Sequence, residues 1–279
     1  MPLDQDFEER SDREMGFLDH LEELRSHIFR SAIYLVVTTI VAFSAKDFLF
    51  GTLIFGPLRN DFWTYKTICS FSHFLGYGES GCIQSAFTGK LQTIGIGEAF
   101  NMHFKVAMVC GFILALPLIL NEVWLFVKPA LSKKERRYFR HFVWVCSFLF
   151  FIGVGFGYFI LSPFSINFLI SYELPLTEHR PSASSFIDLI VMLTLPVGLV
   201  FELPIVIYFL SKAGIITHRI MAGNRRFAYM LIIILAAIVT PPDVISQIIV
   251  TIPLVILYEL SIMVAKAQTL NNEKSAQIS

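Results

Sequence analysis

Charged residues are scarce in this 279-residue sequence, where Asp, Glu, Lys and Arg together make up 16%. Apolar residues make up 55%, and the mean hydropathy is +0.64. So few polar side chains could not cover the surface of a soluble globule of this size. The composition therefore excludes a soluble domain and indicates an integral membrane protein that contacts lipid.

An excess of charge of either sign is also missing, because 22 basic residues balance 22 acidic ones. No overall field attracts nucleic acid, so we expect no nucleic-acid partner. The N-terminal segment is acidic and polar, without the basic and then apolar order of a cleavable signal peptide. We therefore expect no such peptide.

Cysteine is rare, and motifs for catalysis are absent. The four cysteines form no CxxC pair and no Cys/His set with the spacing of metal ligands, so we expect no metal and no cofactor. Neither GxSxG nor HExxH occurs, and both are signatures of hydrolases. The sequence does not indicate an enzyme.

Long apolar runs are what the sequence does contain. A spanning helix needs ~20 apolar residues, and such runs lie at about 27–50, 99–127, 142–161, 186–211, 227–240 and 244–265. We predict an all-α integral membrane fold with six transmembrane helices. Pro241 and Pro242 separate the last two runs and predict a helical hairpin, and the fifth run covers only ~21 Å of a ~30 Å hydrocarbon core. Prolines within runs predict kinked helices at Pro117, Pro196, Pro204 and Pro253.

The distribution of Lys and Arg predicts the orientation. Six basic residues lie between residues 128 and 140, four between 212 and 226, and none between the fifth and sixth runs. Because short cytoplasmic loops carry this excess, both termini are predicted to be cytoplasmic. We expect a cytoplasmic segment over residues 1–26 with a short amphipathic helix, a membrane domain over 27–265 and a cytoplasmic tail over 266–279.

Cys69 and Cys82 both lie in the first exported loop. In an oxidising compartment these two residues are expected to form a disulfide, and two unpaired thiols are the alternative.

Glu202 lies inside the fourth apolar run. An acid at the centre of a spanning helix costs roughly 2.5–3.5 kcal/mol on insertion scales, so its presence there favours a function. We interpret it as a polar docking point, with a hydrogen-bonded packing residue as the alternative. Glu259 poses the same question nearer a helix end.

Several short motifs have local structural explanations. Glu22, Glu23 and Arg25 fit a solvated helix face, and Ser132 to Glu135 fits a capping box. Asp243 follows two prolines, as at a helix start. Gly153, Gly155 and Gly157 favour close helix packing, not a nucleotide loop.

Taken in order along the chain, the motifs resemble the TatC family. They are His20-Leu21-Glu22-Glu23-Leu24-Arg25, Pro57-Leu58, Trp124-x-Phe126-x-x-Pro129-Ala130-Leu131 with Glu135-Arg136-Arg137, Phe201-Glu202-x-Pro204, and Thr240-Pro241-Pro242-Asp243-x-x-Ser246-Gln247. The resemblance covers roughly residues 16–265.

The resemblance implies a glove-shaped bundle of six helices that moves folded proteins across a bacterial cytoplasmic membrane, driven by the protonmotive force. By similarity, Glu23 and Glu135, with Arg25 beside them, bind the twin-arginine signal peptide of the cargo. A carboxylate can hold a guanidinium through two hydrogen bonds, which lysine cannot reproduce. Each of the two acids would bind one of the two arginines.

The same resemblance implies an oligomeric complex in lipid with single-span partners of the TatA/TatB type. Glu202 would be the intramembrane docking point, and Asp243 with Gln247 the exported end of a partner-binding face. Structural roles are expected for Pro57, Phe126 and Pro129. An apparent insertion at about 60–92 has no assigned role.

A proton-coupled transporter of small solutes is the alternative function. An acid within a span and kinked helices also suit such a pathway.

Overall fold

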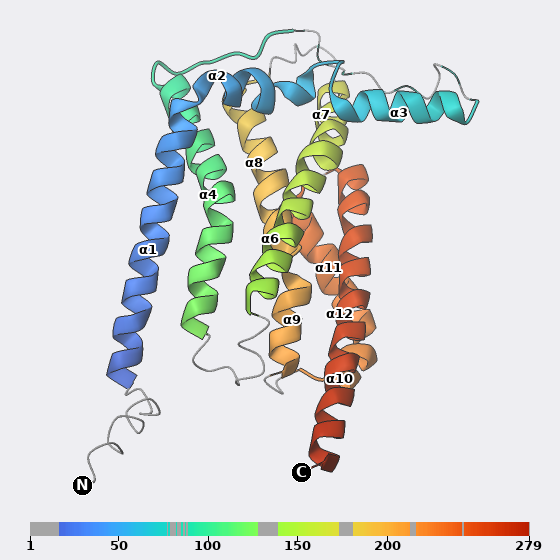
Figure 1. Ribbon diagram of the computed structural model, residues 1–279. Helices are drawn as coiled ribbons and strands as arrows, with labels where there is room; N and C mark the ends of the chain where they lie inside the picture. Colours follow the sequence, from blue (N-terminus) through green and yellow to red (C-terminus); the bar gives the residue numbers. More distant parts are fainter. Residues whose placement is uncertain are drawn as a thin grey trace.

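The computed structural model describes residues 17–76, 78, 82, 85, 87, 89–127, 139–172, 181–212, 216–241 and 243–278. These residues form helices joined by loops, with one isolated bridge between Gln92 and Ser182 and no strand among them. The all-α prediction is confirmed. Figure 1 shows long helices side by side, with the start of α1 and the end of α12 at one end of the bundle and helix α3 across the other.

Among the described residues, five helical segments are long and apolar enough to cross a membrane. The first is Leu21–Ser44 in α1 (Phe17–Ser44), and the second is α4 (Glu98–Val127). The third, Phe142–Ser171, runs through α6 (Phe139–Phe156), η6 (Gly157–Leu161) and α7 (Ser162–Ser171). The fourth, Ala183–Ser211, runs through α8 (Ala183–Val200) and α9 (Leu203–Lys212), and the fifth is Val244–Met263 in α12 (Val244–Ile278). The protein is therefore a multi-pass membrane protein.

The predicted fifth span corresponds to α11 (Arg225–Val239), which follows the short helix α10 (His218–Gly223). Its 15 residues give a length of about 22 Å. This is too short to reach across a ~30 Å hydrocarbon core, so the count of six spans stays a prediction.

The predicted end of the first span was wrong. The helix α1 stops at Ser44, and the chain turns into α2 (Lys46–Phe48), η2 (Leu49–Ile54) and η3 (Gly56–Leu58). Figure 1 shows α2 lying across the end of the bundle. The reason lies in Lys46 and Asp47, because two charged side chains favour the membrane surface over its apolar core.

Glycine allows α1 and α4 to pack closely. A Cβ on Gly111 of α4 would lie 2.5 Å from the Thr39 hydroxyl oxygen and 2.7 Å from the Thr39 Cα. The Thr38 hydroxyl donates a 2.8 Å hydrogen bond to the Gly111 carbonyl. Backbone contact at this crossing thus joins α1 to α4, its main neighbour.

The predicted packing role of the glycine run is confirmed at two of its three positions. A Cβ on Gly157 would overlap the Leu193 carbonyl oxygen of α8, and one on Gly153 would lie 2.8 Å from the Phe201 Cβ. Gly155 has no such neighbour within 4 Å. Small residues therefore bring α6 and η6 against α8.

The remaining helices close the bundle around buried aliphatic side chains. Leu161, Leu193, Val197 and Val250 belong to one cluster that joins η6, α8, α11 and α12. Helix α3 (Trp63–Phe74) lies outside this bundle, in the loop between α1 and α4. Cys69 of α3 and Cys82 form a disulfide.

Candidate functional site

A buried acid lies where α1 begins and α4 ends, at the same end of the bundle as the end of α12 (Figure 1). The Glu122 side chain of α4 is only 5% exposed, and its Oε2 lies 2.6 Å from His27 Nδ1 of α1. An ionised carboxylate can only accept, so the imidazole donates this bond. The Tyr34 hydroxyl donates to Oε1 at 3.3 Å, and Arg30 Nη1 lies 4.0 Å from Oε2.

These partners explain how Glu122 is tolerated at a buried position. Removing the partner of a buried charge costs about 3–5 kcal/mol, because the remaining charge has lost its water. His27 supplies the closest hydrogen bond and is itself only 12% exposed. The pair therefore fixes the orientation of the imidazole ring.

The other ring nitrogen of His27 faces Glu23, one turn earlier on α1. The distance from His27 Nε2 to Glu23 Oε1 is 4.0 Å, and the Glu23 side chain is 33% exposed. Its second oxygen, Oε2, is buried and accepts no hydrogen bond from the described residues. Glu23 thus has a carboxylate oxygen available as a hydrogen-bond acceptor at the edge of the site.

Two more predicted residues lie around this site. The Phe126 ring of α4 meets the His27 ring edge-on, with centroids 6.2 Å apart. Arg25 is exposed, and its guanidinium lies 5.9 Å from the centre of the Phe29 ring. Phe126 therefore borders the site, whereas Arg25 packs along the surface of α1.

Glu135 and Pro129 lie outside the described residues, within the connection 128–138. This connection starts directly after Val127, the last residue of α4 and the neighbour of Phe126.

Glu202 lies in the middle of a spanning segment, at a break between α8 and α9. Phe201 and Glu202 form a turn there, and the amides of Ile205 and Val206 bond the Glu202 carbonyl at 3.0 and 3.1 Å. The Cys146 thiol of α6 is a hydrogen-bonding partner of the carboxyl group. The Glu202 Oε1 atom is buried and has no hydrogen bond among the described residues.

Asp243 starts α12 at the top of the α11–α12 hairpin. Its Oδ1 accepts a 2.6 Å bond from the Ser246 amide, which is the geometry of a helix cap. Its Oδ2 is buried and has no partner in the described part of the chain. Gln247 follows on the first turn, half-buried. Pro57 is also at this end, buried in η3, and its carbonyl accepts a 3.0 Å bond from Tyr65.

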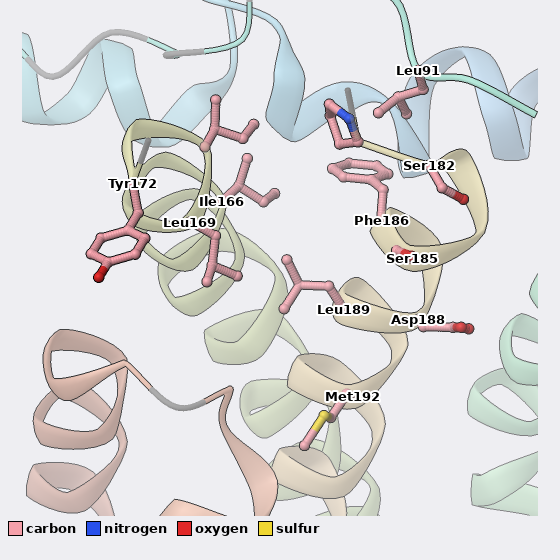
Figure 2. Close-up of a pocket in the computed structure, with 12 residues that line it drawn as sticks. Leu91, Ile166, Leu169, Tyr172, Ser182, Ser185, Phe186, Asp188, Leu189 and Met192 are labelled. Atoms are coloured by element: carbon pink, nitrogen blue, oxygen red, sulfur yellow. The ribbon is translucent and has the colours of Figure 1, made fainter. Parts of the chain in front are cut away.

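A cavity of about 680 Å³ opens between α7 and α8. In Figure 2, Ile166 and Leu169 of α7 face Leu189 of α8, while Asp188 points to the opposite side. There Asp188 forms a 2.5 Å ion pair with Lys105 of α4. The lining is mostly apolar.

Glu259 of α12 is paired. Arg225 Nη2 lies 3.1 Å from its Oε2, and the Tyr229 hydroxyl donates a 2.5 Å bond to its Oε1. These contacts tie α11 to α12, which gives Glu259 a structural role.

The structure therefore separates the predicted residues into three places: Glu23 with Phe126 at the end where α1 begins, Glu202 within a span, and Asp243 with Gln247 and Pro57 toward the opposite end. Sequence reasoning missed His27 and Glu122. Glu122 could have been noticed as an acid inside an apolar run, the same signal that singled out Glu202.

Comparison with protein-family models matches residues 19–253 to "Sec-independent protein translocase protein (TatC)". The Sec-independent protein translocase protein TatC of Blattabacterium sp. subsp. Periplaneta americana is 36% identical over 253 residues, which cover 90% of this chain and 95% of the relative. TatCy of Bacillus subtilis is 31% identical over 265 residues, covering 94% of this chain and 93% of the relative.

The fold is similar to that of a solved structure, described as "Crystal Structure of Twin Arginine Translocase Receptor- TatC". The TM-score is 0.67 at 30% sequence identity, covering 90% of this chain and 99% of the other. A second structure of this receptor, in DDM, gives a TM-score of 0.69 at 29% identity, covering 88% and 99%.

Proposed function

The chain belongs to the TatC family of Sec-independent protein translocase proteins, and from this premise we propose that it is the subunit that binds twin-arginine signal peptides. It is a non-enzymatic component of a protein translocase. In the proposal, Glu23 and Glu135 each bind one of the two signal arginines at the cytoplasmic face, and Arg25 lies at the edge of this binding site.

The geometry of Glu23 is the observation that carries this proposal. One carboxylate oxygen is 4.0 Å from the His27 imidazole and the other accepts no hydrogen bond among the described residues. A guanidinium presents two parallel N–H groups to such a carboxylate. The Glu23 side chain as a whole is also one-third exposed, so a peptide can approach it from solution, although Oε2 itself is buried.

Sequence proximity supports Glu135 as the second acid. Phe126 borders His27 at the end of α4, and residue 135 follows within the connection that begins after Val127. The connection carries five basic residues, and Arg140 follows in the first turn of α6, which favours a cytoplasmic location. The end with Glu23, Glu122 and both termini is then cytoplasmic.

The remaining parts of the proposal follow from this orientation. We place the protein in a bacterial cytoplasmic membrane, with α11 completing six spans through local thinning of the bilayer or burial against its neighbours. Its cargo is folded proteins with twin-arginine signals. Residues 1–26 and 266–279 flank the membrane domain on the cytoplasmic side.

Glu202, Asp243 and Gln247 are proposed contacts for single-span partners of the TatA/TatB type. Glu202 and Asp243 each have a buried carboxylate oxygen without a hydrogen bond in the described residues. A polar group on a partner helix would satisfy the Glu202 oxygen, which is costly to leave unpaired within a membrane.

Family membership favours the translocase over the solute transporter. The Lys105–Asp188 ion pair and the apolar cavity beside it are compatible with either function, but the relatives are protein translocase components.

Photo-crosslinking tests the proposed receptor role. A photoreactive residue at Ser26, exposed beside Glu23 on α1, or at Ser132 in the α4–α6 connection is expected to capture a signal peptide with Arg-Arg and not its Lys-Lys version. The same probe at Ile33, which is exposed further along α1, serves as a control. Any capture at Ile33 should be the same for the Arg-Arg and the Lys-Lys peptide. Equal capture of both peptides at Ser26 and Ser132 would return Glu135 to a capping role.

A further inference from the structure

The exposed side of α3 carries large aromatic side chains. Trp63 and Phe71 are each 61% exposed, and Phe74 is 87% exposed. At 3.6 residues per turn these three positions fall within about 80° of the helix circumference. They form one aromatic face, which we define by Trp63, Phe71 and Phe74.

A second side of α3 is fastened to the protein. Thr64, Tyr65 and Ser72 are buried, and the Thr64 hydroxyl donates to the Phe159 carbonyl. The Tyr65 hydroxyl bonds the Pro57 carbonyl and accepts a 3.1 Å bond from Asn167. The remaining exposed positions are Lys66, Thr67, Ser70 and His73, and all four are polar. Thr67 lies within the aromatic face, where its hydroxyl donates a 2.8 Å bond to the Trp63 carbonyl of its own helix.

The helix α3 therefore has three sectors, one toward protein, one polar and one aromatic. Figure 1 shows α3 running across the direction of the spans and extending beyond α7 and α12. The disulfide between Cys69 and Cys82 joins its second half to the following loop. This arrangement holds the helix at a fixed angle beside the bundle.

The aromatic face is continuous with the lipid-facing surface. The Trp63 ring meets Phe159 edge-on at a centroid distance of 5.7 Å. Phe159 belongs to the spanning segment Phe142–Ser171 and is 39% exposed. That segment is 30 residues long, or about 45 Å, so its second half extends into the interface beyond a ~30 Å hydrocarbon core.

We propose that α3 is a membrane-interface helix whose face of Trp63, Phe71 and Phe74 is immersed in the lipid leaflet on the side of the membrane opposite the chain termini. Tryptophan and other aromatic rings favour the boundary between headgroups and acyl chains. An amphipathic helix in this position buries its apolar face about 5–10 Å below the surface while its polar side stays in water. Lys66, Ser70 and His73 supply that polar side. The proposal depends on membrane insertion of the bundle and not on signal-peptide binding.

Spin labelling in vesicles tests the position of each sector. Single cysteines replace Phe74 or His73 in a Cys110→Ala/Cys146→Ala background with the native disulfide intact, and the labelled protein is reconstituted into phosphatidylethanolamine and phosphatidylglycerol vesicles. His73 is a matched control because it is adjacent to Phe74 in the sequence but lies in the polar sector. We expect the label at 74 to collide more with oxygen than with a water-soluble nickel complex, and the label at 73 to show the reverse.

A label at Phe71 repeats the test and should behave like the label at 74. Equal access of the nickel complex to positions 73 and 74 would place α3 in water and overturn the proposal. A label at 74 that is shielded from both reagents would also overturn it, because a second copy or another protein would then cover the aromatic face.

Discussion

His27 on α1 joins Glu122 on α4 through a 2.6 Å hydrogen bond, and its opposite ring nitrogen lies 4.0 Å from Glu23. One imidazole thus connects a buried acid to the one-third exposed acid proposed to bind the signal. Because Glu122 fixes the orientation of the imidazole ring, it also determines which ring nitrogen lies near Glu23. The site depends on the packing of two helices as well as on one motif.

Replacing Glu122 with Gln should weaken both stability and signal binding. The substitution keeps the size of the side chain but turns a charge-assisted bond to His27 into a neutral one, at an expected cost of about 1–3 kcal/mol. Thermal unfolding in detergent should show a lower midpoint, and an Arg-Arg signal peptide should bind less tightly. Asp47→Asn, at an exposed position of α2, is the control. Unchanged values for both quantities in Glu122→Gln would show that the pair does not organise the site.

Replacing Gly111 with Ala should separate α1 from α4. The added methyl group would lie within 2.8 Å of Thr39 backbone atoms, and overpacking of this kind typically costs about 1–3 kcal/mol. Gly155→Ala is the matched control, because it also adds a methyl group to a spanning helix but meets no neighbour within 4 Å. Unfolding midpoints of the two variants compare them directly. Equal midpoints would contradict the close crossing.

Removing the disulfide should loosen α3. Cys69 and Cys82 are 13 residues apart, and closing a loop of about this size stabilises by roughly 3 kcal/mol in the chain-entropy account. In the double variant Cys69→Ser/Cys82→Ser, protease added on the α3 side of the membrane should cut within the loop faster than in the parent. Cys110→Ala, which leaves the disulfide intact, should be cut at the parental rate. A double variant as resistant as the parent would leave α3 held by Thr64 and Tyr65 alone.

Replacing Glu202 with Gln should reduce recovery of single-span partners with this chain and leave signal-peptide binding intact. The amide keeps the shape but replaces the carboxyl group available to a polar group on a partner helix. Thr194→Val is the control, since its hydroxyl bonds the Ile190 carbonyl of its own helix. Co-purification measures partner recovery, and a cargo assay measures transport. Normal recovery and transport in Glu202→Gln would argue against a docking or proton-linked role.

The spanning segments could be predicted from sequence because the bilayer imposes a length and an apolar composition on each. The end of α1 could not be predicted from apolar content alone. Phe48, Leu49 and Phe50 continue the run, but Lys46 and Asp47 turn the chain at the membrane surface. For α11 the sequence correctly indicated an element shorter than the hydrocarbon core.

The candidate site was predictable only in part. Glu23 belongs to a motif that can be compared between sequences, whereas His27 and Glu122 are separated by 95 positions and meet only when α1 crosses α4. Their pairing depends on the backbone contact at Gly111, two turns or more from either residue. Local patterns contain no information about such a crossing.

Equilibrium binding of fluorescent signal peptides to the purified chain in lipid nanodiscs tests the central claim most directly. The account predicts that Glu23→Gln weakens binding of the Arg-Arg peptide about tenfold or more, as loss of a charged hydrogen bond of about 1.5–3 kcal/mol implies, and leaves the weaker Lys-Lys binding nearly unchanged. Glu22→Gln, at the exposed neighbouring position, should bind both peptides like the parent. Equal affinity for the two peptides in the parent, or the same loss from Glu22→Gln as from Glu23→Gln, would contradict a specific carboxylate–guanidinium site at Glu23.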